Sequence, residues 1–187
     1  MNRLEIHDLP LDGLKRVTRQ RLGDHRGFLS RLFCGDELAQ AGWHKPIAQI
    51  NHTCTAVRGT VRGMHFQRPP DSEMKLVSCI RGEVWDVAVD LRRESTTFLR
   101  WHAEPLSATN GHALLIPEGF AHGFQALTDD VELLYCHSAA AYSPTADSGL
   151  NPQDPALAIE WPLPISTISA RDMQHAMLDT HFEGLNP

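Results

Sequence analysis

Three side chains suited to acid–base chemistry stand close together near the middle of the chain: Arg62, His65 and Lys75. They fall at the ends of what the pattern predicts to be neighbouring strands. Arginine binds anions, imidazole titrates near neutral pH and therefore serves as a general base, and an ammonium group stabilises charge developing on oxygen. Gly63 would let the backbone approach closely beside them. The combination predicts carbanion chemistry next to a phosphate-like anion.

Each of these side chains also has an ordinary structural interpretation. Lys75 could be a solvated strand start, and Arg26 and Arg62 could either clamp a phosphate or form surface salt bridges. Tyr135 ends an apolar run and could pack in the core, but a phenol can also protonate a carbanion. The residues alone leave both interpretations open.

A bound metal is the main rival explanation for His65. A metal site needs three or four ligands of suitable type on facing elements. The nearest candidates are Gln67, Glu73 and Asp86, with His122 far downstream, and Gln67 stands where a His-x-His pair would place its second histidine. We therefore predict that no metal is bound here.

Short alternating runs separated by Gly and Pro predict an all-β protein. Strands are expected over 16–21, 28–33, 47–55, 75–80, 84–91, 98–101, 112–116, 121–127 and 132–137, with a helical piece over 36–42 and a short helix capped by Ser169. In 47–55, Gln49, Asn51 and Thr53 share one face of the strand. Neither strand–helix alternation nor a glycine-rich nucleotide motif occurs. This pattern favours one β-sandwich or barrel domain spanning residues 1–187.

Composition excludes several classes of function. A net charge of −6 argues against a protein that coats nucleic acid. The first twenty residues contain no apolar segment typical of a signal peptide, and no run of about 18 apolar residues predicts a membrane span. The four cysteines form no CxxC pair, which favours reduced thiols in a cytoplasmic protein.

Taken together, many segments of the chain resemble the dTDP-4-dehydrorhamnose 3,5-epimerase family, the RmlC-type cupins. The resemblance runs from about residue 4 to 175 in family order, and its joint pattern is far more specific than any one segment. The matching segments are 24–27, 49–51, 61–67, 75–77, 82–90, 116–124, Tyr135, 142–144, 154–155, 159–162 and 169–172.

The resemblance implies a cupin jelly-roll β-sandwich with short helical segments at the termini. It further implies a homodimer that works without metal or organic cofactor on a nucleotide-diphospho-4-keto-6-deoxy sugar. By analogy His65 removes a proton next to the C4 ketone, Asp172 orients His65, Lys75 stabilises the enolate oxygen and Tyr135 returns a proton to the opposite face. Substrate-binding positions by the same analogy are Arg26, Gln49, Asn51, Arg62, His122, Tyr142 and Arg171, and Asp86 is a further candidate partner of His65.

One departure from the family pattern concerns the nucleobase. Arg31 stands where the family commonly carries a glutamate near the base, so a reversed charge leaves the choice of base open. The family also includes enzymes that invert C3 alone or C5 alone. A metal-dependent cupin enzyme and a non-catalytic sugar-nucleotide-binding cupin remain as rivals. The presence of both an acid and a base argues against the binder.

Overall fold

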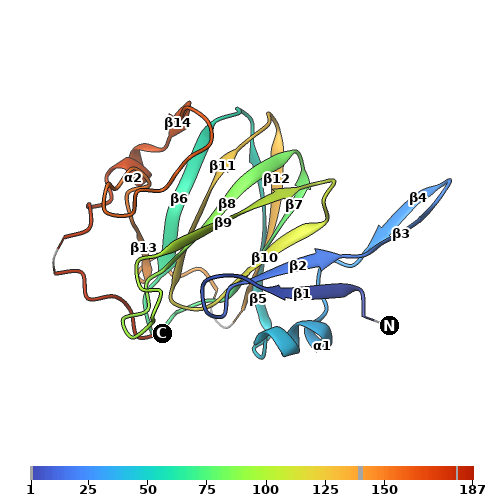
Figure 1. Cartoon of the computed structure of the whole chain (residues 1–187), viewed down its shortest axis with the longest axis horizontal. Coiled ribbons are helices and arrows are strands. Elements are labelled where there is room, and N and C mark those ends of the chain that lie inside the picture. The colour runs from blue at the N-terminus through green and yellow to red at the C-terminus, as the bar shows by residue number, and fades with distance from the viewer. Residues whose placement is uncertain (1, 139–140, 180) are drawn as a thin grey trace.

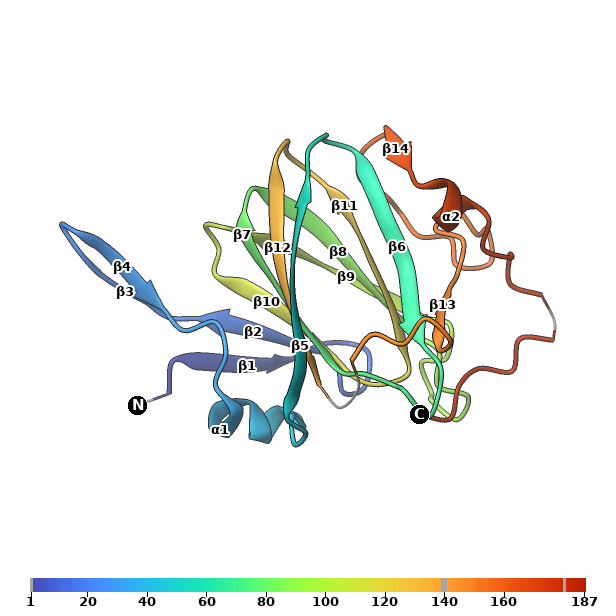
Figure 2. The same ribbon diagram turned by 180° about the vertical axis from the view of Figure 1, so that it is seen from behind.

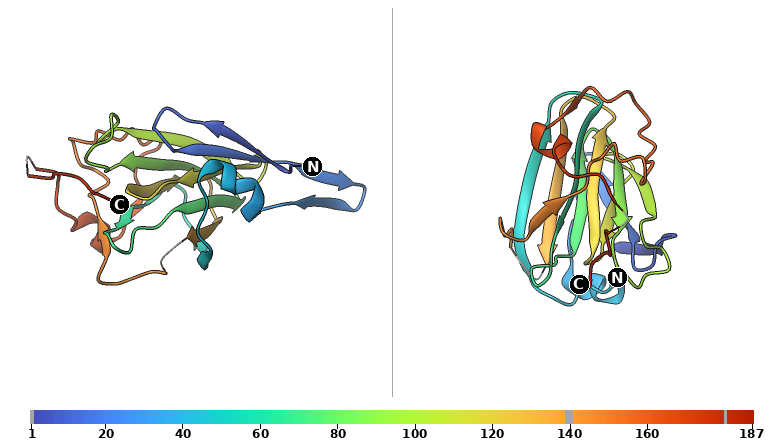
Figure 3. Two further views of the ribbon diagram at one scale, coloured as in Figure 1. Left: turned by 90° about the horizontal axis from the view of Figure 1, so that it is seen from below. Right: turned by 90° about the vertical axis from the view of Figure 1, so that its left-hand side faces the viewer.

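Two β-sheets packed face to face form the body of the protein (Figures 1 and 3). The computed structural model describes residues 2–138, 141–179 and 181–187. The first sheet has the strand order β1-β2-β10-β7-β12-β5, made of Leu4–Asp8, Lys15–Arg19, His112–Ile116, Lys75–Arg81, Val131–Ser138 and Ile47–Thr55. The second has the order β13-β6-β11-β8-β9, made of Asp147–Gly149, Thr60–Gln67, Phe120–Ala126, Glu83–Asp90 and Trp101–Ser107, with β14 (Thr167–Ile168) beside β6. This is the expected jelly-roll sandwich.

The predicted strands agree with the observed ones where alternation is clear. Ile47–Thr55 and His112–Ile116 have the predicted bounds, and most other predicted strands differ by one or two residues at their ends. The predicted strand at 98–101 is wrong, because the Asp90 carboxylate accepts hydrogen bonds from Ser95 and Thr97 and holds this segment in turns. Strand β9 begins only at Trp101 and continues to Ser107.

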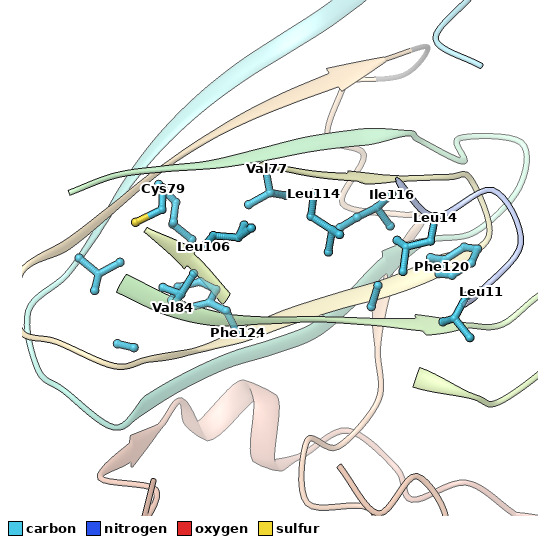
Figure 4. Close-up of a cluster of buried hydrophobic side chains, with 14 residues drawn as sticks. Leu11, Leu14, Val77, Cys79, Val84, Leu106, Leu114, Ile116, Phe120 and Phe124 are labelled. Carbon is cyan, nitrogen blue, oxygen red and sulfur yellow. The ribbon is translucent and has the colours of Figure 1, made fainter. Parts of the chain in front are cut away.

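Apolar side chains from both sheets fill the space between them (Figure 4). The first sheet contributes side chains such as Val77 and Leu114, and the second contributes Val84, Leu106 and Phe124. All five are no more than 2 % exposed. Burial of this apolar surface is the main force that holds the sheets together.

The outer faces of both sheets are partly covered as well. Helix α1 (Gly35–Leu38) and the 3-10 turn η1 (Ala39–Ala41) lie over the first sheet, where Leu38 and Trp43 pack against Leu76 and Leu115. The C-terminal segment covers the second sheet through Leu150, Leu157 and Leu185. This double coverage explains why β8 is almost wholly buried although its side chains alternate between two faces.

One element leaves the body of the sandwich. The hairpin of β3 (Arg21–Asp24) and β4 (Gly27–Ser30) extends outward beyond β2 (Figures 1 and 2). Seven of its eight strand residues are exposed, including Phe28 at 62 % and Leu29 at 68 %. An isolated two-stranded hairpin is marginally stable in water, so these exposed apolar side chains call for a partner surface.

The helices of the described ranges are short. Helices α1 and α2 (Ala170–Met173) have four residues each. Within the part of the chain that the structure describes, no helix is long and apolar enough to cross a membrane.

Candidate active site

A pocket of about 220 Å³ lies at one end of the space between the two sheets. The first sheet provides polar side chains from β5, β7 and β12, and the second provides side chains from β6 and β11. Eight of the predicted site residues line it: Asn51, Arg62, His65, Lys75, His122, Tyr135, Tyr142 and Arg171.

His65 and Asp172 form a hydrogen-bonded pair at the pocket wall. The His65 Nε2 and Asp172 Oδ1 atoms are 2.8 Å apart, and Asp172 is only 3 % exposed. Ser169 caps helix α2 as predicted, because its Oγ accepts from the Asp172 backbone N–H at 3.0 Å. Burial of the Asp172 carboxyl opposes its ionisation, but the hydrogen bond and charge of His65 outweigh burial and lower the pKa of Asp172. An ionised Asp172 can orient His65 and stabilise its protonated form.

Gly63 permits this arrangement in two ways. A Cβ atom at Gly63 would lie 2.5 Å from the Gly123 Cα on the neighbouring strand, and the φ angle of Gly63 is +131°. The Gly63 backbone N–H also donates to Asp172 Oδ2 at 3.3 Å. The close approach expected at this glycine is therefore confirmed, and it brings the β6 backbone within reach of the carboxylate.

Lys75 and Tyr135 reach the pocket from the facing sheet. The Lys75 Nζ lies 3.0 Å from Glu73 Oε1, and the residue is only 8 % exposed. Burial, together with the nearby Asp86 charge, raises the pKa of the Tyr135 phenol above its ordinary value. Tyr135 therefore stays protonated at neutral pH and can act as an acid, while the Lys75 ammonium can stabilise an oxyanion.

His122 and Asp86 form a second, deeper pair behind Tyr135. The His122 Nε2 and Asp86 Oδ1 atoms are 2.8 Å apart, and the His122 ring meets the Tyr135 ring edge to face with 5.9 Å between the ring centroids. Burial raises the pKa of Asp86. The hypothesis that Asp86 is a partner of His65 is therefore wrong, because Asp86 is bound to His122 and Asp172 is the partner of His65.

The pocket mouth carries cations and amides. Arg62 is exposed there, and Arg171 pairs with Asp147, which also accepts from the Tyr142 hydroxyl at 2.9 Å. Gln49 lies just behind this rim, where its Nε2 donates to Asn51 Oδ1 at 2.9 Å and its Oε1 accepts from the Tyr142 backbone N–H at 3.0 Å. Two guanidinium groups at an open mouth suit an anionic group outside the pocket.

Arg26 and Arg31 are not brought to this pocket. Arg26 stands at the tip of the β3–β4 hairpin and binds Asp24, with its Nη2 2.6 Å from Asp24 Oδ2. Arg31 follows the hairpin, and its guanidinium is bound to the Glu37 carboxylate beside helix α1. Neither lines the pocket of its own chain.

The predicted set lacks several side chains that line the pocket. Gln67 accepts from the Ser143 backbone N–H at 2.6 Å, and His137 on β12 pairs with Glu73 in the loop before β7. His137 has the same parity as Tyr135 along β12, so alternation was a signal that could have placed both on one face. Nothing in the local pattern indicated that Glu73 would join them.

His175 lies near the His65–Asp172 pair. Its ring centroid is 6.3 Å from that of His65, and ligand atoms of His65, Asp172 and His175 lie within 4.8 Å of one another. None of the metal partners considered from sequence, including Glu73 and Asp86, belongs to this group of three. Two imidazoles and one carboxylate are a donor set that a transition metal accepts.

Comparison with known proteins agrees with this geometry. The family model described as dTDP-4-dehydrorhamnose 3,5-epimerase matches residues 8–180. The chain belongs to the dTDP-4-dehydrorhamnose 3,5-epimerase family. A Salmonella typhimurium dTDP-4-dehydrorhamnose 3,5-epimerase is 41 % identical over 84 % of this chain and 86 % of that protein. A Streptomyces niveus dTDP-4-dehydrorhamnose 3-epimerase is 36 % identical over 94 % and 84 %.

The fold of a solved member of the epimerase family superposes closely on this chain. The dTDP-6-deoxy-D-glucose-3,5-epimerase of Legionella pneumophila Philadelphia 1, in complex with dTDP-4-keto-L-rhamnose, has a TM-score of 0.90 and 32 % identity. The match covers 98 % of this chain and 99 % of that one. Membership of the epimerase family makes the chain an enzyme of the isomerase class with the cupin fold. Because relatives include both 3,5-epimerases and 3-epimerases, the family name does not fix the number of carbons inverted.

Proposed function

We propose that this epimerase inverts C3, C5 or both in a nucleotide-diphospho-4-keto-6-deoxyhexose. The substrate that best fits the relatives is dTDP-4-dehydro-6-deoxy-glucose, converted to dTDP-4-dehydro-L-rhamnose. A ketone at C4 acidifies the hydrogens on both neighbouring carbons, because loss of either proton gives an enolate. The enzyme must remove the proton from one face of the ring and return one to the other.

The observation that supports this reaction best is the placement of a base and an acid on facing sheets. His65, with Asp172 behind it, stands on β6, whereas Tyr135 stands on β12 across the pocket. In the proposed sequence His65 takes the proton, Asp172 stabilises the resulting imidazolium, and Tyr135 donates to the opposite face. Lys75 stabilises the enolate oxygen through its charge.

The size and polarity of the pocket support a sugar substrate with an external anion. A volume of about 220 Å³ is below the usual range for a whole drug-sized ligand, so the sugar ring fits inside and the nucleotide extends out. In this proposal Arg62 and Arg171, at the mouth, bind the diphosphate. Four further residues are proposed to contact the sugar or to orient the side chains that contact it: Gln49, Asn51, His122 and Tyr142.

Proton exchange in deuterated water is the most direct test. Wild-type enzyme is incubated with dTDP-4-keto-6-deoxyglucose, and deuterium at C3 and C5 is followed by NMR. We expect incorporation at both carbons for a 3,5-epimerase and at one carbon for a single-centre enzyme. His65→Ala should slow exchange by at least about 100-fold, because a positioned general base contributes a factor of this size. Tyr135→Phe should permit exchange but block inversion.

Folding controls make the result decisive. Both variants should keep wild-type circular dichroism and thermal midpoints close to the wild-type value. Full epimerisation by both variants would contradict the proposed mechanism. Absence of exchange by wild-type enzyme would contradict the proposed substrate, and the same experiment with other nucleotide-linked 4-keto sugars would then identify the base.

We propose further that the enzyme is a homodimer joined through the β3–β4 hairpin. Phe28 and Leu29 are exposed on the hairpin, and Ile50 is 59 % exposed on the outer face of the edge strand β5. A second copy would cover these apolar groups and the open edge. Arg26 lies at the hairpin tip, away from its own pocket, so any contact between Arg26 and a nucleotide requires the pocket of the second copy.

We place the enzyme in the cytoplasm. All four cysteines are free thiols in the structure, and Cys79 is fully buried. Burial raises the pKa of the Cys79 thiol to about 11, which leaves it unreactive at neutral pH. Four unpaired cysteines, of which Cys79 is buried and unreactive, agree with a reducing compartment.

A further inference from the structure

The pocket contains a histidine–carboxylate pair that the proposed mechanism does not use. The His137 Nδ1 atom lies 2.6 Å from Glu73 Oε2, and both side chains are almost completely buried. Both residues line the pocket on the side of Lys75 and Tyr135. The pair therefore stands across the pocket from His65 and Asp172, on the opposite sheet.

The contact with Glu73 determines which nitrogen of His137 carries a proton. Burial opposes ionisation of Glu73, but His137 and Lys75 outweigh burial and lower its pKa. An ionised carboxylate only accepts hydrogen bonds, so His137 Nδ1–H must donate to it. In the neutral imidazole the lone pair is then on Nε2, which has only a long contact of 3.5 Å with Asn51 Nδ2.

The strand register places His137 next to the reacting groups. His137 pairs with Lys75 on one side and with Gln49 on the other, while Tyr135 pairs with Asn51 in the adjacent row. Tyr135 and His137 lie two residues apart on one face of β12, with ring centroids 6.1 Å apart and an interplanar angle of 20°. The imidazole therefore lies beside the proposed acid and next to the proposed oxyanion group.

We propose that His137, held by Glu73, is a substrate-binding residue whose Nε2 accepts a hydrogen bond from a hydroxyl group of the sugar ring. This assignment rests on the proposed function, since it concerns the same substrate. A buried acceptor that a hydroxyl satisfies also discriminates against sugars that lack that hydroxyl, because the acceptor would then remain unpaired.

Glu73 extends the assignment to Lys75. One carboxylate oxygen, Oε1, lies 3.0 Å from the Lys75 Nζ, and the other, Oε2, accepts from His137. Glu73 is thus a positioning residue that fixes the ammonium and the imidazole at the same time. Loss of its charge should disturb both the oxyanion contact and the sugar contact.

The test compares substitutions of His137 that keep or remove the hydrogen-bond donor at Nδ1 or the acceptor at Nε2. His137→Asn retains an amide donor close to the Nδ1 position but has no acceptor at the Nε2 position. It should raise KM by roughly 5- to 10-fold, the effect of one lost hydrogen bond, with a smaller change in kcat. His137→Gln places an amide oxygen near the Nε2 position and should recover part of this loss. Glu73→Gln should lower kcat as well, because it loosens Lys75.

A control pair of the same chemistry lies on the opposite face of β12, toward β5. His52 Nε2 and Glu132 Oε2 are 2.9 Å apart on β5 and β12, outside the pocket. His52→Asn and Glu132→Gln should leave KM and kcat within twofold of wild type. If His137→Asn behaves like His52→Asn while wild-type enzyme turns over, the assignment of His137 is wrong and the proposed function stands. A rise in KM in His137→Asn that is smaller in His137→Gln supports the assignment.

Discussion

At the scale of single residues, the protonation of Tyr135 is central to the proposed reaction. The chain has only two tyrosines, Tyr135 and Tyr142, and the pKa of each is raised. For Tyr135 the main cause is burial, whereas Tyr142 donates to the Asp147 carboxylate. We therefore predict that folded enzyme shows little tyrosinate absorbance at 295 nm near pH 10, where unfolded chain is about half ionised.

The same shift predicts how stability depends on alkaline pH. The pKa of Tyr135 is higher in the folded than in the unfolded chain. The contribution of Tyr135 to the free energy of unfolding is therefore fully present below about pH 10 and is lost as pH rises through the folded pKa. Tyr135→Phe should remove this dependence, and urea unfolding at several alkaline pH values measures it. If a tyrosine of the folded wild-type enzyme is half ionised near pH 10, and this titration is absent from Tyr135→Phe, then Tyr135 is not shielded from water.

At the scale of elements, the sequence predicted most strands but not the side-chain contacts made between them. Alternation in 47–55 correctly placed Gln49, Asn51 and Thr53 on one face, because the period of a strand is fixed by its backbone. That His137 would meet Glu73 depends on the register of β12 against β7 and on the loop before Lys75. Such long-range pairings leave no periodic signal in the sequence.

The resemblance supplied what periodicity could not. Residues 65 and 172 are separated by 107 positions, yet the family pattern paired them, and the structure places them 2.8 Å apart. The same pattern could not indicate His137 or His175, since neither belongs to the matching segments. His137 and His175 therefore became candidate site residues only through the structure.

The close approach of the neighbouring strands β6 and β11 depends on Gly63, and this dependence can be measured. Gly63 and Gly27 have similar φ angles, +131° and +134°, but a Cβ meets Gly123 at the first and nothing within 4 Å at the second. Gly63→Ala and Gly27→Ala thus share the backbone strain, and only the first adds overpacking. We expect Gly63→Ala to lose about 1–3 kcal/mol more in the free energy of unfolding, measured by urea denaturation. Equal losses would mean that the strands separate freely to admit the methyl group.

At the scale of the whole molecule, the hairpin and strand β5 expose apolar side chains to solvent, and β5 directs polar side chains into the sandwich. The face of β5 that looks into the sandwich carries Asn51 and Thr53, which line the pocket, while Ile50 on the outer face is exposed. Strand β5 can therefore contribute to the pocket through its inner face and to the proposed subunit interface through its outer face. The inner face serves a polar ligand, and the outer face suits a protein surface.

The dimer proposal predicts that charge on these apolar groups separates the subunits. Phe28→Asp combined with Leu29→Asp should convert the sedimenting species from dimer to monomer, because the buried charges would lack partners. Met177→Asp, at a side chain that is 51 % exposed on the C-terminal segment, is the control and should leave the dimer intact. If Arg26 completes the pocket of the second copy, the monomeric variant should also bind the nucleotide more weakly, as Arg26→Ala should within an intact dimer. A hairpin variant that sediments like wild type would contradict the interface. Weaker binding by the monomer, without weaker binding by Arg26→Ala, would assign the hairpin to assembly alone.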